Sequence, residues 1–403
     1  MNKIYYENQY IREFRATIIG SKILNGKYHV TLDKTAFFPG GGGQFCDLGF
    51  IDDEEVENVY EELGVVYHVL ENEPINKENI KCTLNWERRT DGMHQHLGQH
   101  VLSGCFFKLF SANTVSFHLG KEFSTVDIVG HLEENQMRKV EEFANEVIGK
   151  NLKVESIVPL KEELENLGLR RDLPNTDDEI RVVKVGDLDI NACCGVHPSS
   201  TMELRLIKII KWEKNKGATR IEFLAGSRAI NDTLNKEKYL TDLCKYLNTN
   251  EGEALSRVKK LRNEIKESLD ENKKMSYEVA GYEAIKLLEE SEKIDIFTIV
   301  KKIYINKNIK YIEKVVERLV ENENVVVLIA NKNNEKSNLI FASSKNFNLI
   351  GVDELLKKSI TLINGKGGGS KMLAQGFGES KRIDECLESV VNSIKYNVKN
   401  KNI

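Results

Sequence analysis

Three of the eight histidines lie within seven residues, as His94, His96 and His100. His96 and His100 are four residues apart, and on a helix this spacing places two imidazoles one turn apart on the same face. Further along the chain, Cys193 and His197 repeat the four-residue separation. Three imidazoles and a thiolate form a ligand set that holds Zn²⁺ tetrahedrally. The spacing therefore predicts a zinc site made by His96, His100, Cys193 and His197.

The same residues leave two questions open. Cys194 offers a second thiol and stays open as the sulfur ligand, although the repeated spacing favours Cys193. Four protein ligands close a structural zinc site, whereas a catalytic zinc keeps three and an open position. Either one ligand is displaceable, or the metal organises a pocket without generating the nucleophile.

Leu97 replaces the glutamate of His-Glu-x-x-His, which argues against peptide hydrolysis by that route. His94 and His118 are candidates for proton transfer beside the metal, or are ordinary structural histidines.

The elements that position these residues begin with a small β-rich domain at 1–88, which we expect to be barrel-like. Its strands are expected in 14–33, on either side of Asn25-Gly26, and near 65–70 and 80–84. Between them lie Gly40 to Gly43. Four glycines in succession predict a loop, because each costs backbone entropy inside a helix or strand.

The middle block, 89–226, predicts an α+β domain that contains the zinc site. Apolar residues at helical spacing place both His96 and His100 on one helix. The helices are expected at 87–111, 133–149 and 159–168, and the strands at 180–185, 203–212 and 218–224. The chain as a whole is therefore expected to be α+β.

The last part of the chain predicts a helical linker and a small α/β domain. In 227–292, Leu255, Val258, Leu261, Ile265 and Leu269 step by three or four, which is typical of a long, coiled-coil-like helix or helical hairpin. In 293–403, expected strands alternate with expected helices. Strands are expected at 295–303, 325–331 and 338–344, and helices at 308–322, 352–358 and 380–395.

Composition narrows the class of protein. The 403 residues exceed one typical domain, and 58 basic against 62 acidic residues exclude a chain that is basic overall. No apolar run reaches the roughly 18 residues of a membrane span. Seven scattered cysteines, an odd number, argue against a disulfide framework. With a polar N-terminus, we expect a cytoplasmic protein that does not contact membranes.

Three further segments, taken with the paired metal motifs, resemble one family. They are Thr35-Ala36-Phe37-Phe38-Pro39 with Gly41-Gly42-Gly43-Gln44 and Asp47-x-Gly49, then Gly217-Ala218-Thr219-Arg220-Ile221-Glu222-Phe223, and finally Gly365-Lys366-Gly367-Gly368-Gly369 with Ala374-Gln375-Gly376. In this order they are similar to the editing half of alanyl-tRNA synthetase and its freestanding relatives, the AlaX trans-editing proteins. No aminoacylation module comes before them, so the chain looks like the long AlaX form and not like a synthetase. It departs from the usual Cys-Gly-Gly-Thr-His at Cys194 and at Val196, which lacks the threonine hydroxyl.

The resemblance implies a deacylase that hydrolyses the ester of seryl-tRNA, or of glycyl-tRNA, specific for alanine. Binding alone rejects a near-isostere with an added hydroxyl only about 10²-fold, so a second site that recognises the hydroxyl is needed. Thr35 matches the position implicated in that recognition, and Gln44 offers an amide for the ester carbonyl or terminal ribose. Gly42 and Gly43 would supply backbone N–H donors to the oxyanion. Zn²⁺ would bind the substrate or orient the attacking water.

The resemblance also implies tRNA contacts in the C-terminal domain. The residues implied are Lys366, Gly367, Gly368, Gly369, Lys371 and Gln375. Lysines surround this glycine stretch, which we expect to be a loop whose amides hold phosphates. It is not a nucleoside-triphosphate loop, because Gly-x₄-Gly-Lys-Ser/Thr is absent. A homodimer through the helical region or the C-terminal domain is a further expectation.

Two other functions stay open. One is a related deacylase for mischarged threonine tRNA, since threonyl-tRNA synthetase carries a similar zinc-motif editing fold. The other is a zinc-stabilised tRNA-binding module without hydrolytic activity. Substituting Thr35 or Gln44 separates this module from an enzyme, because only an enzyme loses deacylation while tRNA binding persists.

Overall fold

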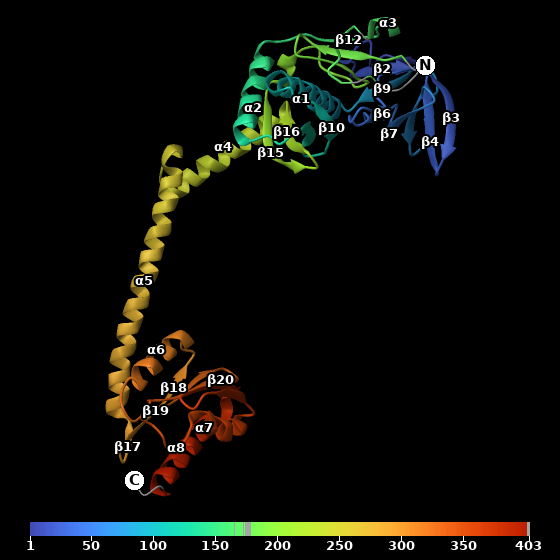
Figure 1. Cartoon of the computed structure of the whole chain (residues 1–403). Helices are drawn as coiled ribbons and strands as arrows, with labels where there is room; N and C mark the ends of the chain where they lie inside the picture. The colour runs from blue at the N-terminus through green and yellow to red at the C-terminus, as the bar shows by residue number, and fades with distance from the viewer. Residues whose placement is uncertain (165, 172, 174–178, 401–403) are drawn as a thin grey trace. The chain divides into compact units, whose positions relative to one another are not determined.

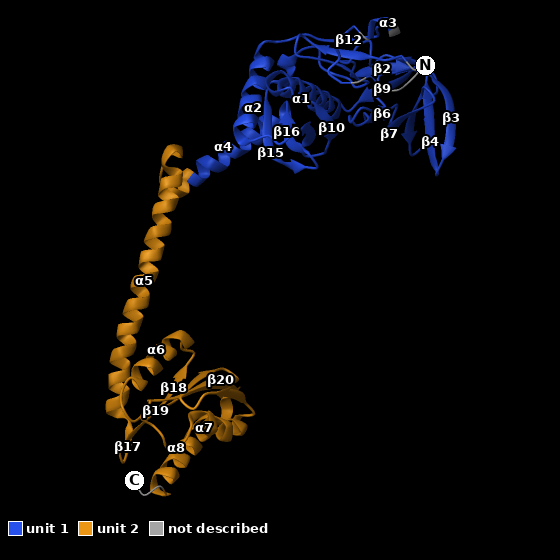
Figure 2. Ribbon diagram, in the orientation of Figure 1, with its two compact units in different colours: residues 1–243 blue, residues 244–403 orange. Residues whose placement is uncertain are grey.

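The computed structural model of the chain describes residues 1–164, 166–171, 173 and 179–400. Two compact units comprise residues 1–243 and residues 244–403, coloured separately in Figure 2. Helix α4 (Ser227–Leu247) contains the boundary. Both units combine helices with largely antiparallel sheets, so the predicted α+β class is confirmed. The finer division into four domains stays a prediction.

The first unit opens with a seven-stranded antiparallel sheet. Its strands lie in the order β2 (Glu13–Ala16), β9 (Ile80–Leu84), β6 (Gly49–Ile51), β7 (Glu54–Glu62), β8 (Val65–Leu70), β4 (Lys27–Leu32) and β3 (Ile18–Leu24). The predicted hairpin is confirmed, because Asn25 and Gly26 join β3 to β4 with φ values of +54° and +79°. Among the described residues the end strands β2 and β3 do not pair, so strand pairing does not close the sheet into the expected barrel.

A buried helix carries the two predicted histidine ligands. Helix α1 (Trp86–Phe110) lies beside α2 (Glu134–Gly149) in Figure 1, and both pack on a sheet of order β10 (Thr114–Leu119), β11 (Ser124–Val129), β16 (Ala218–Ala225) and β15 (Ile207–Asn215). Asn85 begins α1 by accepting the Arg88 N–H at 3.0 Å. An ideal Cβ on Gly98 would lie 2.7 Å from the Ala225 Cβ, so glycine lets α1 approach β16 closely. This close packing fixes the helix that holds His96 and His100.

The cysteine motif follows a separate three-stranded sheet. Its strands are β12 (Val154–Ile157), β13 (Val182–Val185) and β14 (Asp189–Ala192), all antiparallel. Cys193 comes directly after β14, and α1 packs against this strand. A parallel pair of short strands, β1 (Asn2–Lys3) and β5 (Lys34–Thr35), brings the chain's first residues beside Thr35. Two distant parts of the chain therefore converge on α1.

Two predicted elements were wrong in extent. Within the described part of 159–168, only α3 (Lys161–Leu164) is helical, and residue 165 lies outside the described residues. The strand expected at 203–212 begins later, as β15, because Thr201–Leu204 forms a 3₁₀ turn (η1). The Thr201 hydroxyl and amide bond the backbone near Val147 and Leu152, and these contacts hold the turn.

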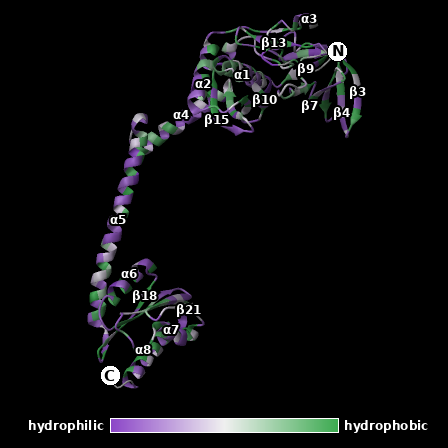
Figure 3. Ribbon diagram, viewed as in Figure 1, coloured by the Kyte–Doolittle hydropathy of each residue, from purple (hydrophilic) through white to green (hydrophobic). Residues whose placement is uncertain are grey.

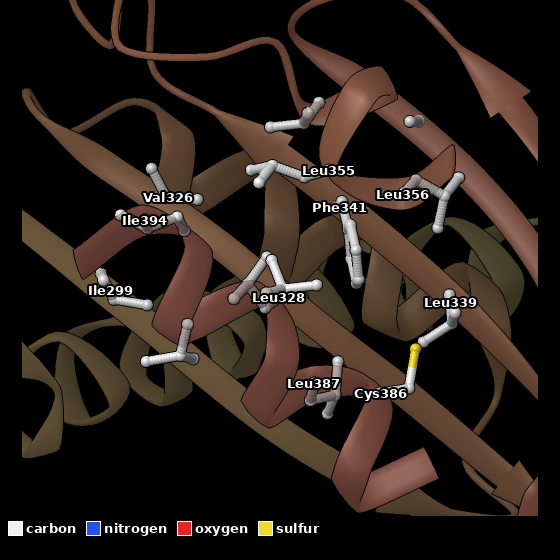
Figure 4. Close-up of a cluster of buried hydrophobic side chains, with 14 of the residues drawn as sticks. Ile299, Val326, Leu328, Leu339, Phe341, Leu355, Leu356, Cys386, Leu387 and Ile394 are labelled. Carbon is white, nitrogen blue, oxygen red and sulfur yellow. The ribbon is translucent and has the colours of Figure 1, made fainter. Parts of the chain in front are cut away.

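The second unit is a six-stranded sheet with helices on both faces. Its order is β17 (Glu292–Ile294), β18 (Phe297–Ile305), β19 (Val325–Asn333), β20 (Lys336–Ser343), β22 (Leu373–Glu379) and β21 (Lys366–Gly369). Val327 and Ile329 face α5 (Glu251–Glu290) and α6 (Ile309–Val320). Val326 and Leu328 face α7 (Val352–Ser359) and α8 (Ile383–Asn400), in the core drawn in Figure 4. Turns η2 (Ile360–Ile363) and η3 (Ser380–Arg382) complete it.

The glycine stretch near residue 367 is not the loop expected from the sequence. Lys366–Gly369 forms the edge strand β21 and pairs antiparallel with β22. An ideal Cβ on Gly367 would lie 2.6 Å from the Gln375 carbonyl oxygen and 2.9 Å from Ile360 Cδ1. The strand is glycine-rich because its backbone packs directly against these neighbours. Its amides are partly used in the sheet and do not form a phosphate loop.

The predicted long helix is present as two helices, α4 and α5. In Figure 3 hydrophobic residues recur along α5 between hydrophilic ones. Ala280, Ala284 and Leu287 near its end are buried against α6 and the sheet. Nearer its start, Leu255 and Ile265 are 67% and 61% exposed. Within the described ranges, no helix combines the length and apolar character that crossing a membrane requires.

Candidate metal centre

The structure brings the four predicted ligands together in the first unit. One ligand atom from each of His96, His100, Cys193 and His197 lies within 4.8 Å of the other three. Cys193 Sγ lies 3.4 Å from His96 Nε2 and 3.6 Å from His197 Nε2. Zinc bonds of about 2.0 Å to nitrogen and 2.3 Å to sulfur place tetrahedral ligands about 3.5 Å apart, so these distances suit one ion. Cys194 is exposed and is not one of the four.

His96 is oriented by the glycine-rich motif. Its Nδ1 lies 3.0 Å from Gln44 Oε1, which also accepts the Val196 N–H at 3.0 Å. Because the amide oxygen accepts, the proton of His96 is on Nδ1 and Nε2 is free to bind a metal. An ideal Cβ on Gly195 would lie 2.2 Å from the His96 ring, so only glycine fits there. Gln44 therefore joins the N-terminal motif to both metal motifs.

His100 is oriented by a buried carboxylate. Its Nδ1 lies 2.8 Å from Asp189, which also accepts hydrogen bonds from Arg170 Nε and Asn191 Nδ2, each at 2.7 Å. Burial opposes the charged form of His100, but the pairing with Asp189 and the nearby Cys193 sulfur outweigh it and raise the pKa of His100 to about 9. His100 Nε2 is buried and has no hydrogen-bond partner within the described part of the chain. With Nδ1 bonded to Asp189, Nε2 is the His100 atom that could bind a metal, once the metal displaces its proton.

The surroundings of the Cys193 thiol favour its ionised form, the thiolate. Burial raises the pKa of a thiol, but the imidazoles of His96 and His197, with His100, hold the pKa of Cys193 well below its ordinary value. The Gly195 N–H donates to the Cys193 sulfur at 3.4 Å. Arg181 donates to the carbonyls of Cys193 and Gly195 at 3.1 and 2.6 Å. The loop is thus held in the form that presents the sulfur.

The glycine-rich loop lies against this cluster. Gly40 to Gly43 all have positive φ, between +58° and +140°, which explains four consecutive glycines. The amides of Gly41 and Gln44 donate to each other's carbonyls, leaving Gly42 and Gly43 at the tip. An ideal Cβ on Gly42 would lie 3.2 Å from Cys194 Sγ and 3.8 Å from the His96 ring. The predicted loop is confirmed, and its tip adjoins the metal ligands.

Thr35 is fully buried, and its hydroxyl is bound within the protein. Thr35 Oγ1 lies 2.9 Å from His68 Nε2 and accepts the Phe37 N–H at 3.1 Å. Burial lowers the pKa of His68 to about 4, so the ring is neutral near pH 7. Since His68 Nδ1 lies 3.2 Å from the Val30 carbonyl, which only accepts, the Thr35 hydroxyl donates to His68. The oxygen of Thr35 keeps one acceptor position.

A buried ion pair fixes the glycine-rich segment to α1. Arg89 is 1% exposed, and its Nε donates to both Asp47 oxygens, at 3.0 and 2.9 Å. Arg89 also donates to the carbonyls of Ala36 and Gln9. Asp47 in turn accepts the Phe38 N–H at 2.6 Å. The start and end of the motif are therefore tied to the helix that carries His96.

The remaining candidates lie outside the cluster. His94 packs on Gly226, where an ideal Cβ would lie 2.3 Å from Nδ1, and His118 is exposed on β10. Lys366, Lys371 and Gln375 are exposed residues of the second unit.

Sequence reasoning missed His68, Asp189, Arg170 and Arg181. Only His68 carried a local signal, because it alternates with Val66 and Leu70 on the inward face of β8.

Comparison with known proteins supports these motifs. The model of the threonyl and alanyl tRNA synthetase second additional domain matches residues 180–222, and the DHHA1 domain matches residues 295–396. The first match contains Cys193 and His197. The second contains the glycine-rich edge strand.

Individual relatives extend the match along the chain. Over 395 residues it is 31% identical to the alanyl-tRNA editing protein AlaX-L of Pyrococcus horikoshii, which covers 94% of this chain and 95% of that protein. It is 28% identical to the alanine–tRNA ligase of Pyrococcus abyssi over 96% of this chain but only 43% of the ligase. A match to the solved C-Ala domain of Aquifex aeolicus alanyl-tRNA synthetase spans 27% of this chain and 96% of that domain, at 22% identity and a TM-score of 0.24. The match to AlaX-L confirms the resemblance carried by the motifs: the chain belongs to the AlaX-L family of alanyl-tRNA editing proteins.

Proposed function

We propose that this chain is a zinc-dependent hydrolase that removes a wrongly attached amino acid, chiefly serine, from tRNA specific for alanine. Its relative at 31% identity is named an alanyl-tRNA editing protein. One observation carries the proposal at the level of residues. Gln44 of the glycine-rich motif bonds both His96 and the Val196 amide, so the two sets of motifs make one site. An editing hydrolase needs them together, because one set binds the metal and the other faces the substrate.

The residues present suit a zinc ion. Three nitrogens and one sulfur are ligands that zinc prefers, and the buried His100 Nε2 has no other partner among the described residues. In such a set zinc supplies polarisation of an ester carbonyl or of a water molecule. The chain's own contribution is to orient the ester. We assign the amides of Gly42 and Gly43 as donors to the ester oxygen, and Gln44 as the residue that orients His96.

Thr35 supports a preference for serine over alanine. Its hydroxyl donates to His68, and its oxygen keeps one acceptor position. A serine hydroxyl would therefore donate to Thr35, and alanine has no donor to offer. Because Thr35 is fully buried in this structure, the acyl group must open a space beside it. Glycine also lacks the hydroxyl, so glycyl-tRNA is expected to be a poorer substrate than seryl-tRNA.

The experiment follows the release of labelled serine, glycine and alanine from tRNA specific for alanine, with the full-length protein and its metal content measured. Fast release of serine with alanine retained is expected. Thr35→Val should abolish this preference while tRNA binding persists, and Thr35→Ser should keep it. Zinc and tRNA binding without release of any amino acid would overturn the hydrolase and leave a binding module.

A second candidate is a deacylase for mischarged threonine tRNA. The matching domain at 180–222 is shared by threonyl and alanyl synthetases, so it does not choose between the two tRNAs. The match over 94% of the chain to a protein named for alanyl-tRNA favours alanine. The same release assay on seryl-tRNA specific for threonine separates the candidates, because each predicts release from one tRNA only.

We propose that tRNA contacts the outer face of the edge strands β21 and β22. Register places Lys366 opposite Phe377 and Gly368 opposite Gln375, and the side chains of Lys366, Phe377 and Gln375 are exposed. A hollow of about 490 Å³ on this face is lined by these same side chains. Lysine suits a phosphate and phenylalanine suits a base. Lys366→Ala should weaken tRNA binding and lessen its salt dependence, whereas the exposed Lys345→Ala should not.

We also propose a homodimer that buries the start of α5. The apolar stripe of Leu255, Val258, Ile265 and Leu269 is 44% to 67% exposed within the described chain. A helix that repeats apolar residues every three or four positions gains stability when a second helix covers them. A second copy of this chain presents the same stripe.

A further inference from the structure

The imidazoles of the metal cluster are not held alike. His96 Nδ1 has Gln44 as partner at 3.0 Å, and His100 Nδ1 has Asp189 at 2.8 Å. His197 Nδ1 is buried and has no hydrogen-bond partner among the residues that the structure describes. A partner on the second ring nitrogen fixes the orientation of a ligating histidine and makes it more basic. His197 has neither advantage.

Cys193 is held through its backbone instead. Arg181 donates to the carbonyls on either side of Cys194, and the Tyr6 hydroxyl donates to the Cys194 carbonyl at 2.7 Å. The backbone around His197 is held too, by the Val196 and Ser199 amides, but neither bond reaches its imidazole ring. The His197 ring contacts other rings of the cluster, with centroids 4.6 Å from His96 and 5.0 Å from His100. Its position therefore depends on packing, whereas the other three ligands are hydrogen-bonded into place.

We propose that His96, His100 and Cys193 are the permanent ligands and that His197 is the exchangeable one. This inference rests on the proposed zinc site. Four ligand atoms would close the coordination shell, whereas a catalytic zinc keeps an open position. If His197, the least restrained ligand, can leave the metal, a site with four ligands can still provide the open position. The other ligand side chains would each lose a hydrogen bond on leaving, from His96 to Gln44, from His100 to Asp189, and from the Gly195 N–H to the Cys193 sulfur.

The test measures metal affinity and not deacylation. Metal-free full-length protein is titrated with Zn²⁺ against a chromophoric chelator, for the wild type and for His197→Ala, His96→Ala, His100→Ala and Cys193→Ser. We expect His197→Ala to bind one zinc with affinity reduced about tenfold, and the other three variants to lose at least another tenfold. Equal losses in all four variants would show four equivalent ligands and overturn the inference.

Two further measurements keep the test informative if a ligand variant fails to fold. One uses Co²⁺ in place of Zn²⁺, and the other uses variants of Gln44 and Asp189, the residues that bond His96 and His100. In Co²⁺-loaded protein, the sulfur-to-cobalt charge-transfer band should persist in His197→Ala, and its loss there would count against the proposal. Gln44→Met and Asp189→Asn should each lower zinc affinity at least as much as His197→Ala. Smaller effects would mean that those partners do not hold His96 and His100. A wild type that binds no zinc would refute the metal site itself.

Discussion

Arg89 and Asp47 form an ion pair in which both side chains are at most 2% exposed, and this pair connects α1, which carries His96 and His100, to the glycine-rich segment. Arg89 lies two turns before His96 on α1, and Asp47 lies three residues after Gln44. This buried contact, together with the bond from Gln44 to His96, therefore sets the distance between the histidine cluster and the glycine-rich loop. A change at this pair should affect both stability and site geometry.

Arg89→Met should destabilise the fold by about 3–5 kcal/mol, because it leaves the Asp47 carboxylate buried without its cation. Urea unfolding followed by circular dichroism gives the free energy. The matched control is Arg138→Met, which removes an exposed pair with Glu134 on α2 and should leave the unfolding midpoint unchanged. A similar midpoint for both variants would mean that the Arg89–Asp47 pair contributes no more than a surface contact.

The pairing of His96 with His100 in the cluster could be predicted from sequence because its geometry is local. Four-residue spacing on one helix fixes the relation of His96 to His100 without knowledge of the fold. Asp189 could not be found in this way, since it lies 89 residues from His100 and only the packing of α1 on β14 brings them together. The glycines near Gly367 were misread as a loop for a related reason. A run of glycine is compatible with a turn or with a crowded strand, and the pairing with β22, which the glycines themselves do not signal, distinguishes them.

Gln44 should matter through its oxygen. Gln44→Met removes the acceptor for His96 and Val196 at similar volume, so zinc affinity is expected to fall by about 10–100-fold. Gln44→Glu keeps an acceptor oxygen for both His96 and the Val196 N–H and should retain the metal. Zinc competition titration measures both. If Gln44→Met retains wild-type affinity, the ring of His96 is oriented by something other than this amide.

His68 should make stability depend on pH. Its pKa is about 4 in the folded protein against an ordinary value of 6.5, because burial disfavours the charged ring. Between these values the unfolded chain binds the extra proton, so stability falls as pH decreases from about 6.5 to about 4, by about 3 kcal/mol at most.

The variant His68→Gln lacks this titration, so its unfolding free energy should depend less steeply on pH across this range. The exposed His118→Gln should keep the wild-type slope. Urea unfolding at several pH values between 4 and 7 provides the comparison. Parallel curves for wild type and His68→Gln would show that His68 is not buried as a neutral ring.

Two neighbouring glycines of β21 should respond differently to the same change. A Cβ on Gly367 would lie 2.6 Å from the Gln375 carbonyl oxygen, whereas a Cβ on Gly368 meets nothing within 4 Å. Gly367→Ala should therefore destabilise the second unit by about 1–3 kcal/mol. Gly368→Ala should not. Hydrogen exchange of the β21 and β22 amides in the full-length protein reports this locally, and equal protection in both variants would contradict the packing explanation.

The exposed stripe on α5 should control assembly. Ile265 is 61% exposed within the chain, and Ile265→Lys keeps a good helix former while placing a charge in the proposed dimer contact. Sedimentation equilibrium should give a dimer mass for the wild type and a monomer mass for this variant. The control variant Lys266→Ala changes the next residue, which is exposed but does not belong to the apolar stripe, and this variant should remain dimeric. A wild type that is monomeric at all concentrations would overturn the dimer, whereas a dimeric Ile265→Lys variant would place the interface on a different surface of the chain.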